Sequence, residues 1–372
     1  MTIDHREGSD GKDRMTQDDV LRVTVGVDTH KDTHVARAKD HLGRRLGAAK
    51  IVPTTPAGHR ELLTWARSLG QVEAFGVEGT GSWGAGLARY LAAQDVAVFE
   101  VSRPDRQTRR RHGKSDPADA DAAASAVLSG DAMGLPKSGD DRVEMVRVLR
   151  VARKTALKAR TQAMNALQAV VVTAPAELRE LLRTLSGGTL VQKCARLRPG
   201  PLTTPTAAAK AALRSLAARY QSLSQEAAGL ASSLDQLVAE AAPALVALFG
   251  VGTDSAGALL VAAGDNPERL HSEAGFSMLC GVAPVEASSG KVSRHRLNRG
   301  GDRQANAALY RIVLVRLCWD QTTKDYMARR TAQGRSKRDI IRCLKRYVAR
   351  EIYRVLSATP ASETTMADDA VA

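Results

Sequence analysis

The sequence predicts an N-terminal α/β domain with a mixed sheet, then two long helices, then a mainly helical C-terminal part. Three observations support this prediction. Short apolar runs alternate with helical patterns between residues 21 and 135. Two helical stretches then flank a segment rich in Gly and Pro. Finally, aromatic residues make up 3% of a chain that is 44% hydrophobic, so the cores consist of Ala, Leu and Val, which favours helix packing.

The N-terminal part predicts a hairpin followed by alternating strands and helices. The hairpin joins strands at 23–28 and 34–38. The later elements are strands at 50–53, 72–78 and 96–102 and helices at 58–68, 83–94 and 118–129. Because a hairpin comes first and helices are interleaved later, the pattern indicates a mixed sheet rather than a doubly wound one.

The central part predicts two long helices, at 141–174 and 207–242, the second broken only by Gly229. A softer segment at 187–205 separates them, which indicates a helical hairpin or coiled coil that serves oligomerisation. The predicted domains are therefore 21–135, 141–242 and 243–357. The tails 1–20 and 358–372 are rich in Asp, Ser, Thr and Ala, and we expect them to be disordered.

The charge predicts a polyanionic partner. The net charge is +14 and the pI about 9.9, which indicates nucleic acid most simply. Between residues 291 and 350 there are 17 Lys and Arg against 4 Asp and Glu. A second basic cluster contains Arg109, Arg110, Arg111 and Lys114. An anionic membrane surface is the weaker alternative, because no long basic amphipathic helix with bulky apolar residues stands out.

The cysteines and the N-terminus predict a cytoplasmic location without a membrane partner. Four cysteines lie far apart and form no CxxC pair, so neither a zinc site nor a disulfide framework is expected. The first twenty residues are polar and acidic, unlike a signal peptide. No run of 18 apolar residues exists that would predict a transmembrane helix.

Four acidic residues predict a metal-dependent phosphodiester enzyme. Asp28 and Glu78 each end an apolar run, where a charge is costly unless a cation or partner is present. Asp116 and Asp119 open a helix and share one of its faces. Hard oxygen ligands of this kind suit Mg²⁺ or Mn²⁺, and two such ions can clamp both oxygens of a phosphoryl displacement.

Each acidic element has a simpler explanation when taken alone. An Asp after a strand is usually a turn residue, and a DxxD pair at a helix start matches the helix dipole. A rival site is a phosphate loop at Gly79-Thr80-Gly81-Ser82, as in sugar-kinase-like folds, but no matching second loop follows. The order and spacing of all four acids favour the metal site.

Two C-terminal motifs predict contacts with DNA phosphates. The turn Gly250-Val251-Gly252 precedes a helix, like half of a helix-hairpin-helix element, and would expose main-chain N–H groups. Ser288 and Ser289 follow an apolar stretch and are by themselves a plain loop. Basic residues come next, where they would hold a phosphate beside a serine hydroxyl: Lys291, Arg294, Arg296, Arg299 and Arg303.

These motifs occur in a familiar order. They are Gly26-Val27-Asp28, Gly76-Val77-Glu78-Gly79, Lys114-Ser115-Asp116-x-x-Asp119-Ala120, Gly250-Val251-Gly252 and Gly281-x-x-Pro284-x-x-x-Ser288-Ser289-Gly290. As a set they resemble the insertion-sequence 110 family of transposases, which includes the pilin-gene invertases. The resemblance covers residues 23–356.

The resemblance implies a RuvC-like N-terminal domain with an RNase H-type fold. Its DEDD acids match Asp28, Glu78, Asp116 and Asp119 and would bind Mg²⁺ or Mn²⁺. The family's C-terminal domain supplies a serine that becomes covalently joined to DNA, which by motif is Ser289, with Ser288 the alternative.

The family also implies partners. A coiled coil drives assembly into a dimer or tetramer, in which one subunit's acidic domain completes another's serine site. A structured bridge RNA pairs with donor and target DNA, so that base pairing selects the sequence. Such a protein works in the bacterial cytoplasm, at the nucleoid.

The sequence departs from the family after the Ser-Gly motif. Many relatives carry Lys-Arg-Gly-Asn, whereas here Arg299-Gly300 is followed by Gly301, and Asn306 is the candidate for the displaced Asn. The expected function is a recombinase that moves its own insertion element. Two alternatives stay open: a metal-only RuvC-like nuclease such as a junction resolvase, and a non-catalytic nucleic-acid-binding regulator.

Overall fold

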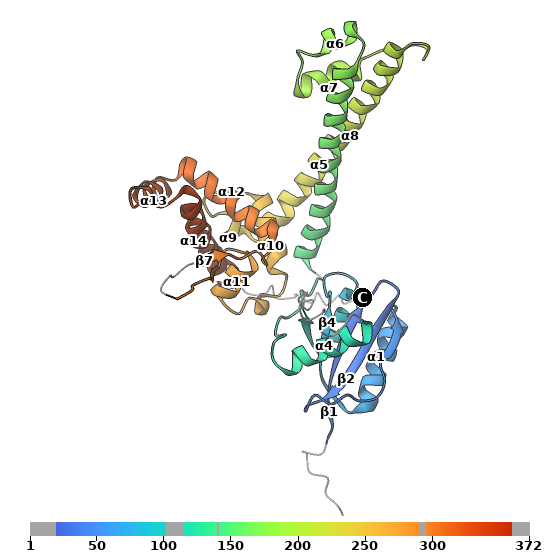
Figure 1. Ribbon diagram of the computed structural model, residues 1–372, viewed down its shortest axis with the longest axis vertical. Coiled ribbons are helices and arrows are strands. Elements are labelled where there is room, and N and C mark those ends of the chain that lie inside the picture. The colour runs from blue at the N-terminus through green and yellow to red at the C-terminus, as the bar shows by residue number, and fades with distance from the viewer. Residues whose placement is uncertain (1–19, 102–114, 140, 291–294, 359–372) are drawn as a thin grey trace, which may run out of the picture. The chain divides into compact units, whose positions relative to one another are not determined.

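The computed structural model describes residues 20–101, 115–139, 141–290 and 295–358 (Figure 1). These residues form two compact units, and the division falls between Ser138 and Gly139. Most of both predicted tails therefore lies outside the described residues. The same holds for six of the predicted nucleic-acid contacts: Arg109, Arg110, Arg111, Lys114, Lys291 and Arg294.

The first unit is built on a five-stranded mixed sheet with strand order β3-β2-β1-β4-β5. The strands are β1 (Arg22–Thr29), β2 (Thr33–Asp40), β3 (Lys50–Pro53), β4 (Gln71–Glu78) and β5 (Ala97–Val101). Strand β2 pairs antiparallel with β1 and β3, and β4 pairs parallel with β1 and β5. This pairing confirms the predicted mixed sheet. The sheet and its helices have the architecture of an RNase H-like domain.

Helices cover both faces of this sheet. One face packs against α1 (Pro56–Leu69) and α2 (Ala85–Ala92) and contains the larger apolar core of the unit, with Val27, Phe75 and Leu62 fully buried. The other face packs against α4 (Asp116–Leu128). Successive side chains of a strand point to opposite faces of the sheet. Alternate residues of each strand therefore face the α1 and α2 layer or the α4 layer.

Glycines let α4 approach the sheet closely. Gly26 on β1 and Gly76 on β4 are paired neighbours in the sheet. A Cβ at position 26 would collide with the main chain of Ala120, and one at position 76 would lie 2.8 Å from the carbonyl oxygen of Ala123. The helix therefore rests on the strand backbones, where only glycine fits.

The second unit begins with two long helices, α5 (Arg142–Thr173) and α8 (Pro205–Ala241), which lie side by side in antiparallel orientation (Figure 1). Leu167 and Val171 of α5 are buried with Leu213 of α8. The expected break at Gly229 is wrong, because α8 continues through it. A glycine on an exposed helix surface costs only about 1 kcal/mol relative to alanine, and packing outweighs that.

The prediction of a softer segment at 187–205 is wrong in its first half. Helices α6 (Ala176–Leu182) and α7 (Gly187–Ala195) fill the connection between α5 and α8. Leu190 and Cys194 of α7 are buried against the long helices. The glycines that suggested a loop occupy only the first turn of α7, where N–H groups have no helical partner in any case.

The rest of the second unit is a helical globule. Its elements are α9 (Pro243–Val246), α10 (Thr253–Ala263), η2 (Pro267–Arg269), α11 (Glu273–Leu279), β6 (Pro284–Glu286), β7 (His295–Leu297), α12 (Arg303–Trp319), α13 (Gln321–Ala332) and α14 (Lys337–Ala358). Leu259, Phe276 and Ile352 are fully buried in its core. Val146 of α5 and Val238 of α8 belong to the same core, so the helical pair is rooted in the globule.

Candidate active site and nucleic-acid surface

The sheet places the first two acids on the face that α4 covers. Gly26 and Gly76 are paired and face α4, and Asp28 and Glu78 lie two residues further along the same strands. Side chains two apart share a face, so both carboxylates point to the α4 side. Asp28 is 7% exposed and Glu78 is 9% exposed, so both carboxylates are largely shielded from solvent.

Helix α4 brings the other two acids to this edge. Its first turn contains Asp116 and Asp119, and Asp119 donates its N–H to the carbonyl of Ser115 at 3.0 Å. The helix is fixed to β2 by Lys39, whose ammonium lies 2.6 Å from the hydroxyl of Ser125 and 3.0 Å from the carboxylate of Asp121. The helix is thus held against the sheet by polar contacts as well as by its close packing on Gly26 and Gly76.

The other three acids affect the ionisation of Asp28. Burial raises the pKa of Asp28 above its ordinary value; His30 opposes this, and the charges of Glu78, Asp119 and Asp116 reinforce it. All three other carboxylates therefore oppose the ionisation of Asp28. A buried carboxylate with a raised pKa, surrounded by like charges, is stabilised by a bound cation.

His30 lies beside two of the predicted acids, although sequence analysis did not identify it. Its Nε2 lies 3.3 Å from the carboxylate of Asp28 and 3.4 Å from that of Asp116. The ligand atoms of these three residues lie within 4.8 Å of one another, close enough to share a metal ion. The only signal in the sequence was the spacing Asp28-x-His30, which alone is too common to be informative.

The rival phosphate loop is disfavoured by its own hydrogen bonds. The N–H groups of Ser82 and Gly84 both donate to the carbonyl of Gly79, at 2.8 and 3.1 Å. The hydroxyl of Ser82 donates to the same carbonyl at 3.1 Å. Groups that would cradle a phosphate are thus engaged in closing the turn after β4.

Both candidate serines are exposed on the connection that follows β6. Strand β6 pairs antiparallel with β7, with Val285 opposite Arg296. Ser288 and Ser289 lie beyond the end of β6. Three predicted phosphate contacts follow and are exposed: Arg296, Arg299 and Arg303. The two serines thus follow β6, and the strand paired with β6 carries Arg296.

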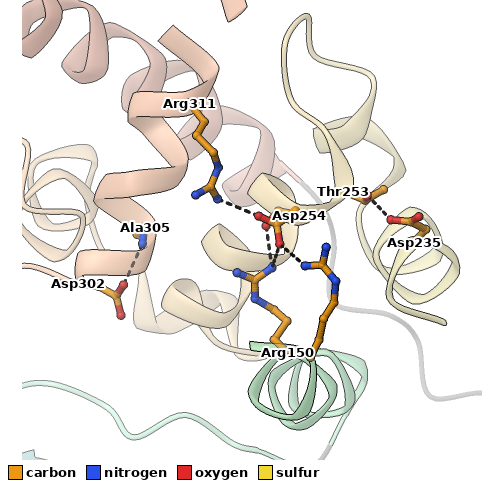
Figure 2. A network of polar contacts seen from close by, with 8 residues as sticks. Arg150, Asp235, Thr253, Asp254, Asp302, Ala305 and Arg311 are labelled. Atoms are coloured by element: carbon orange, nitrogen blue, oxygen red, sulfur yellow. Dashed lines mark hydrogen bonds and ion pairs between the residues drawn. The ribbon is translucent and has the colours of Figure 1, made fainter. Parts of the chain in front are cut away.

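The Gly250-Val251-Gly252 turn connects α9 to α10. Gly250 has a φ of 79°, which favours glycine, and Gly252 caps α10. At the start of α10, Asp254 accepts hydrogen bonds from Arg150, Arg153 and Arg311 (Figure 2). This surface is therefore rich in guanidinium groups held by a single carboxylate.

Comparison with known families decides the identity. A family model described as a transposase, the DEDD type of IS110, matches residues 25–174. A second model, the transposase IS116/IS110/IS902 family, matches residues 242–328. Together they cover well over half of the chain. The chain belongs to the IS110 family of transposases. No protein of curated function matches this transposase at a significant level.

The family makes this transposase an enzyme that cuts and rejoins DNA as part of an insertion sequence. Its DEDD domain indicates the use of a divalent metal, in accord with the acidic cluster around Asp28. Across the described residues, no helix combines the length and apolarity that a membrane span requires. All four cysteines are free thiols.

Proposed function

We propose that this transposase joins its substrate DNA covalently to Ser289 and uses Mg²⁺ or Mn²⁺ held by Asp28, Glu78, Asp116 and Asp119. The observation that carries the metal part is the cluster of Asp28, His30 and Asp116, whose ligand atoms lie within 4.8 Å of one another. The observation that supports the serine part is the exposed position of Ser289 after β6, the strand that pairs with the one carrying Arg296.

The donor set fits a hard divalent cation. Carboxylate oxygens dominate it, as Mg²⁺ prefers, and the nitrogen of His30 is a further donor that Mn²⁺ accepts more readily. When bound, the cation supplies positive charge that stabilises the phosphate during displacement. Asp28 and Glu78 hold their carboxylates on strand ends, so the protein presents the ligands on rigid elements.

The serine step exchanges one phosphodiester for another. The Oγ of Ser289 forms a bond to phosphorus, and the bond from phosphorus to one deoxyribose oxygen breaks. The hydroxyl proton of the serine is lost and the released deoxyribose oxygen takes up a proton. Nearby guanidinium groups such as Arg296 and Arg299 stabilise the charge on the phosphate. The bond energy is retained for rejoining.

The decisive experiment is to look for a denaturation-resistant protein–DNA adduct with labelled DNA carrying the element's ends. Wild-type protein should form it, Ser289→Ala should lose adduct and recombination yet bind DNA, and Ser288→Ala is the matched control. If only Ser288→Ala loses the adduct, the nucleophile is the neighbouring residue. If the wild type cleaves without any adduct, the protein is a metal-only nuclease.

We further propose a structured bridge RNA as guide and a homo-oligomer as the active form. The net charge of +14 supports binding of more than one nucleic acid. Exposed apolar residues on α5, Met145, Val148 and Val151, support self-association, since such side chains gain by burial in an interface. Light scattering of the protein alone and with RNA tests the second point, and a monomer in both states would refute it.

A further inference from the structure

The described residues of the β6–β7 hairpin, which include both candidate serines, are mostly exposed. Pro284, Glu286 and Ser289 are all exposed. An exposed hairpin gains little positional precision from its own packing. Its placement therefore depends on its base, where the chain leaves the helical globule at Cys280-Gly281 and returns at Asn298.

One side-chain amide holds the outgoing end of this base. The Nδ2 of Asn306, in the first turns of α12, donates to the carbonyl of Cys280 at 2.9 Å and to that of Gly281 at 3.0 Å. Its Oδ1 accepts from the ammonium of Lys345 on α14 at 2.9 Å. A lysine can only donate, so it fixes which end of the amide faces the carbonyls.

The returning end is tied to the same place. The Nδ2 of Asn298 donates to the carbonyl of Met278 at 3.0 Å, and the N–H of Asp302 donates to that of Leu279 at 2.6 Å. A Cβ at Gly301 would collide with the main chain of Gly281, whose φ is 65°. The two ends of the hairpin thus meet backbone to backbone.

The helix that carries Asn306 is itself anchored at this point. Asp302 caps α12 by accepting from the N–H groups of Gln304 and Ala305 at 2.7 and 2.9 Å. Figure 2 shows the bond to Ala305. Burial of Lys345, aided by the charge of Arg342, lowers the pKa of this lysine. The ammonium is thus partly withdrawn from water where it donates to Asn306.

We propose that Asn306 is a positioning residue for the serine chemistry, which sets the direction in which the β6–β7 hairpin presents Ser289, with Lys345 orienting its amide. This inference rests on the proposed function, because it assigns the nucleophile to this hairpin. An aspartate at 306 would keep the shape and the partner Lys345. It would lose both donors and set a carboxylate against two carbonyls.

The first test measures the rate of adduct formation at saturating DNA. Asn306→Asp should lower this rate by about ten- to a hundredfold, the size expected when a reacting group is misplaced, with the dissociation constant for DNA within about twofold of wild type. Gln304→Glu, an exposed change with the same charge difference two residues away, should leave both unchanged. Equal loss of binding and rate would indicate a merely structural role and overturn the proposal.

A second test does not depend on serine chemistry. Hydrogen exchange of peptides spanning 282–298 in the intact protein should be faster in Asn306→Asp than in wild type or Gln304→Glu. Lys345→Met keeps the aliphatic stem and should show a smaller increase, so it serves if the aspartate variant does not fold. Unchanged exchange in these variants would overturn the proposal, whereas absence of an adduct in wild type would overturn only the proposed nucleophile.

Discussion

The guanidinium of Arg150 on α5 donates to both the main-chain carbonyl and the carboxylate of Asp254 on α10, at 2.7 and 3.1 Å. Arg153 on α5 and Arg311 on α12 donate to the same carboxylate, at 3.1 and 2.9 Å. Asp254 therefore fastens the long helix α5 to two helices of the globule. The side chain of Arg150 is only 17% exposed, so its charge depends on this partner.

Asp254→Asn should destabilise the second unit by about 1–3 kcal/mol, because it leaves a mostly buried guanidinium without its counter-charge. Glu180→Gln is the matched control, since Glu180 pairs with Arg179 and Arg183 at exposed positions. It should shift the unfolding midpoint much less, because exposed ion pairs are screened by water. Urea unfolding followed by circular dichroism measures both, and equal midpoints would show that the Asp254 pairs contribute nothing special.

The acid sensitivity of the first unit should depend on His34. This residue is fully buried and stacks on His59 with ring centroids 5.6 Å apart. Burial is the main cause that lowers the pKa of His34, the imidazoles of His59 and His30 add to it, and together they bring this pKa to about 4. Since an unfolded histidine titrates near 6.5, the unfolded state binds the extra proton between those values.

Stability should therefore be complete above about pH 6.5 and fall as the pH drops towards 4, by at most about 1.4 kcal/mol per pH unit for one proton. His34→Phe, which keeps an aromatic ring beside His59, should flatten this dependence. His41→Phe, at an exposed histidine of the same unit, is the control. Urea midpoints at pH 7.5 and pH 5 for the three proteins decide whether His34 is the responsible group.

Divalent cations should stabilise the first unit if the four acids hold them. Mg²⁺ or Mn²⁺ should raise the melting temperature of wild type, because a ligand that binds only the folded state shifts the equilibrium by mass action. Asp28→Asn and Asp119→Asn should lose the shift and strand cleavage together. Asp131→Asn, at an exposed acid of the same unit, should retain both. Cleavage that persists in excess EDTA would contradict the metal assignment.

The exposed arginines after β7 should contact DNA phosphates. Replacing Arg299 and Arg303 by Gln should reduce the slope of log affinity against log salt by about 0.9 for each lost contact on duplex DNA. Arg214→Gln with Arg219→Gln, both exposed on α8, removes equal charge elsewhere. A slope that changes equally in both double variants would mean that charge alone matters, and not this surface.

The strand acids could be predicted because their positions are local signals. Asp28 and Glu78 each end an apolar run, and this local pattern is visible in the sequence itself. His30 could not be predicted, since its imidazole meets Asp116 only after α4 packs on the sheet. The contact is tertiary and leaves no periodic trace in the sequence.

The same distinction explains the helical parts. The length and composition of the segments predict helices α5 and α8. Helix α7 was not predicted, because Gly187 and Gly188 occupy its first turn. Asn306 stood out only as a displaced family residue. Its partners, the carbonyls of Cys280 and Gly281 and the ammonium of Lys345, belong to distant segments, so its geometry needed the fold.

Because α4 packs directly on Gly26 and Gly76, main-chain contact sets the distance between this helix and the sheet at the acidic site. The gap between the strand acids and the helix acids is set there by backbone atoms, which every sequence shares, and not by rotamers that could repack. Mutational drift elsewhere in the core can thus leave the spacing intact. At Gly26 and Gly76, by contrast, no small substitution is tolerated, because even the methyl group of alanine would push the helix away from the sheet and widen the site.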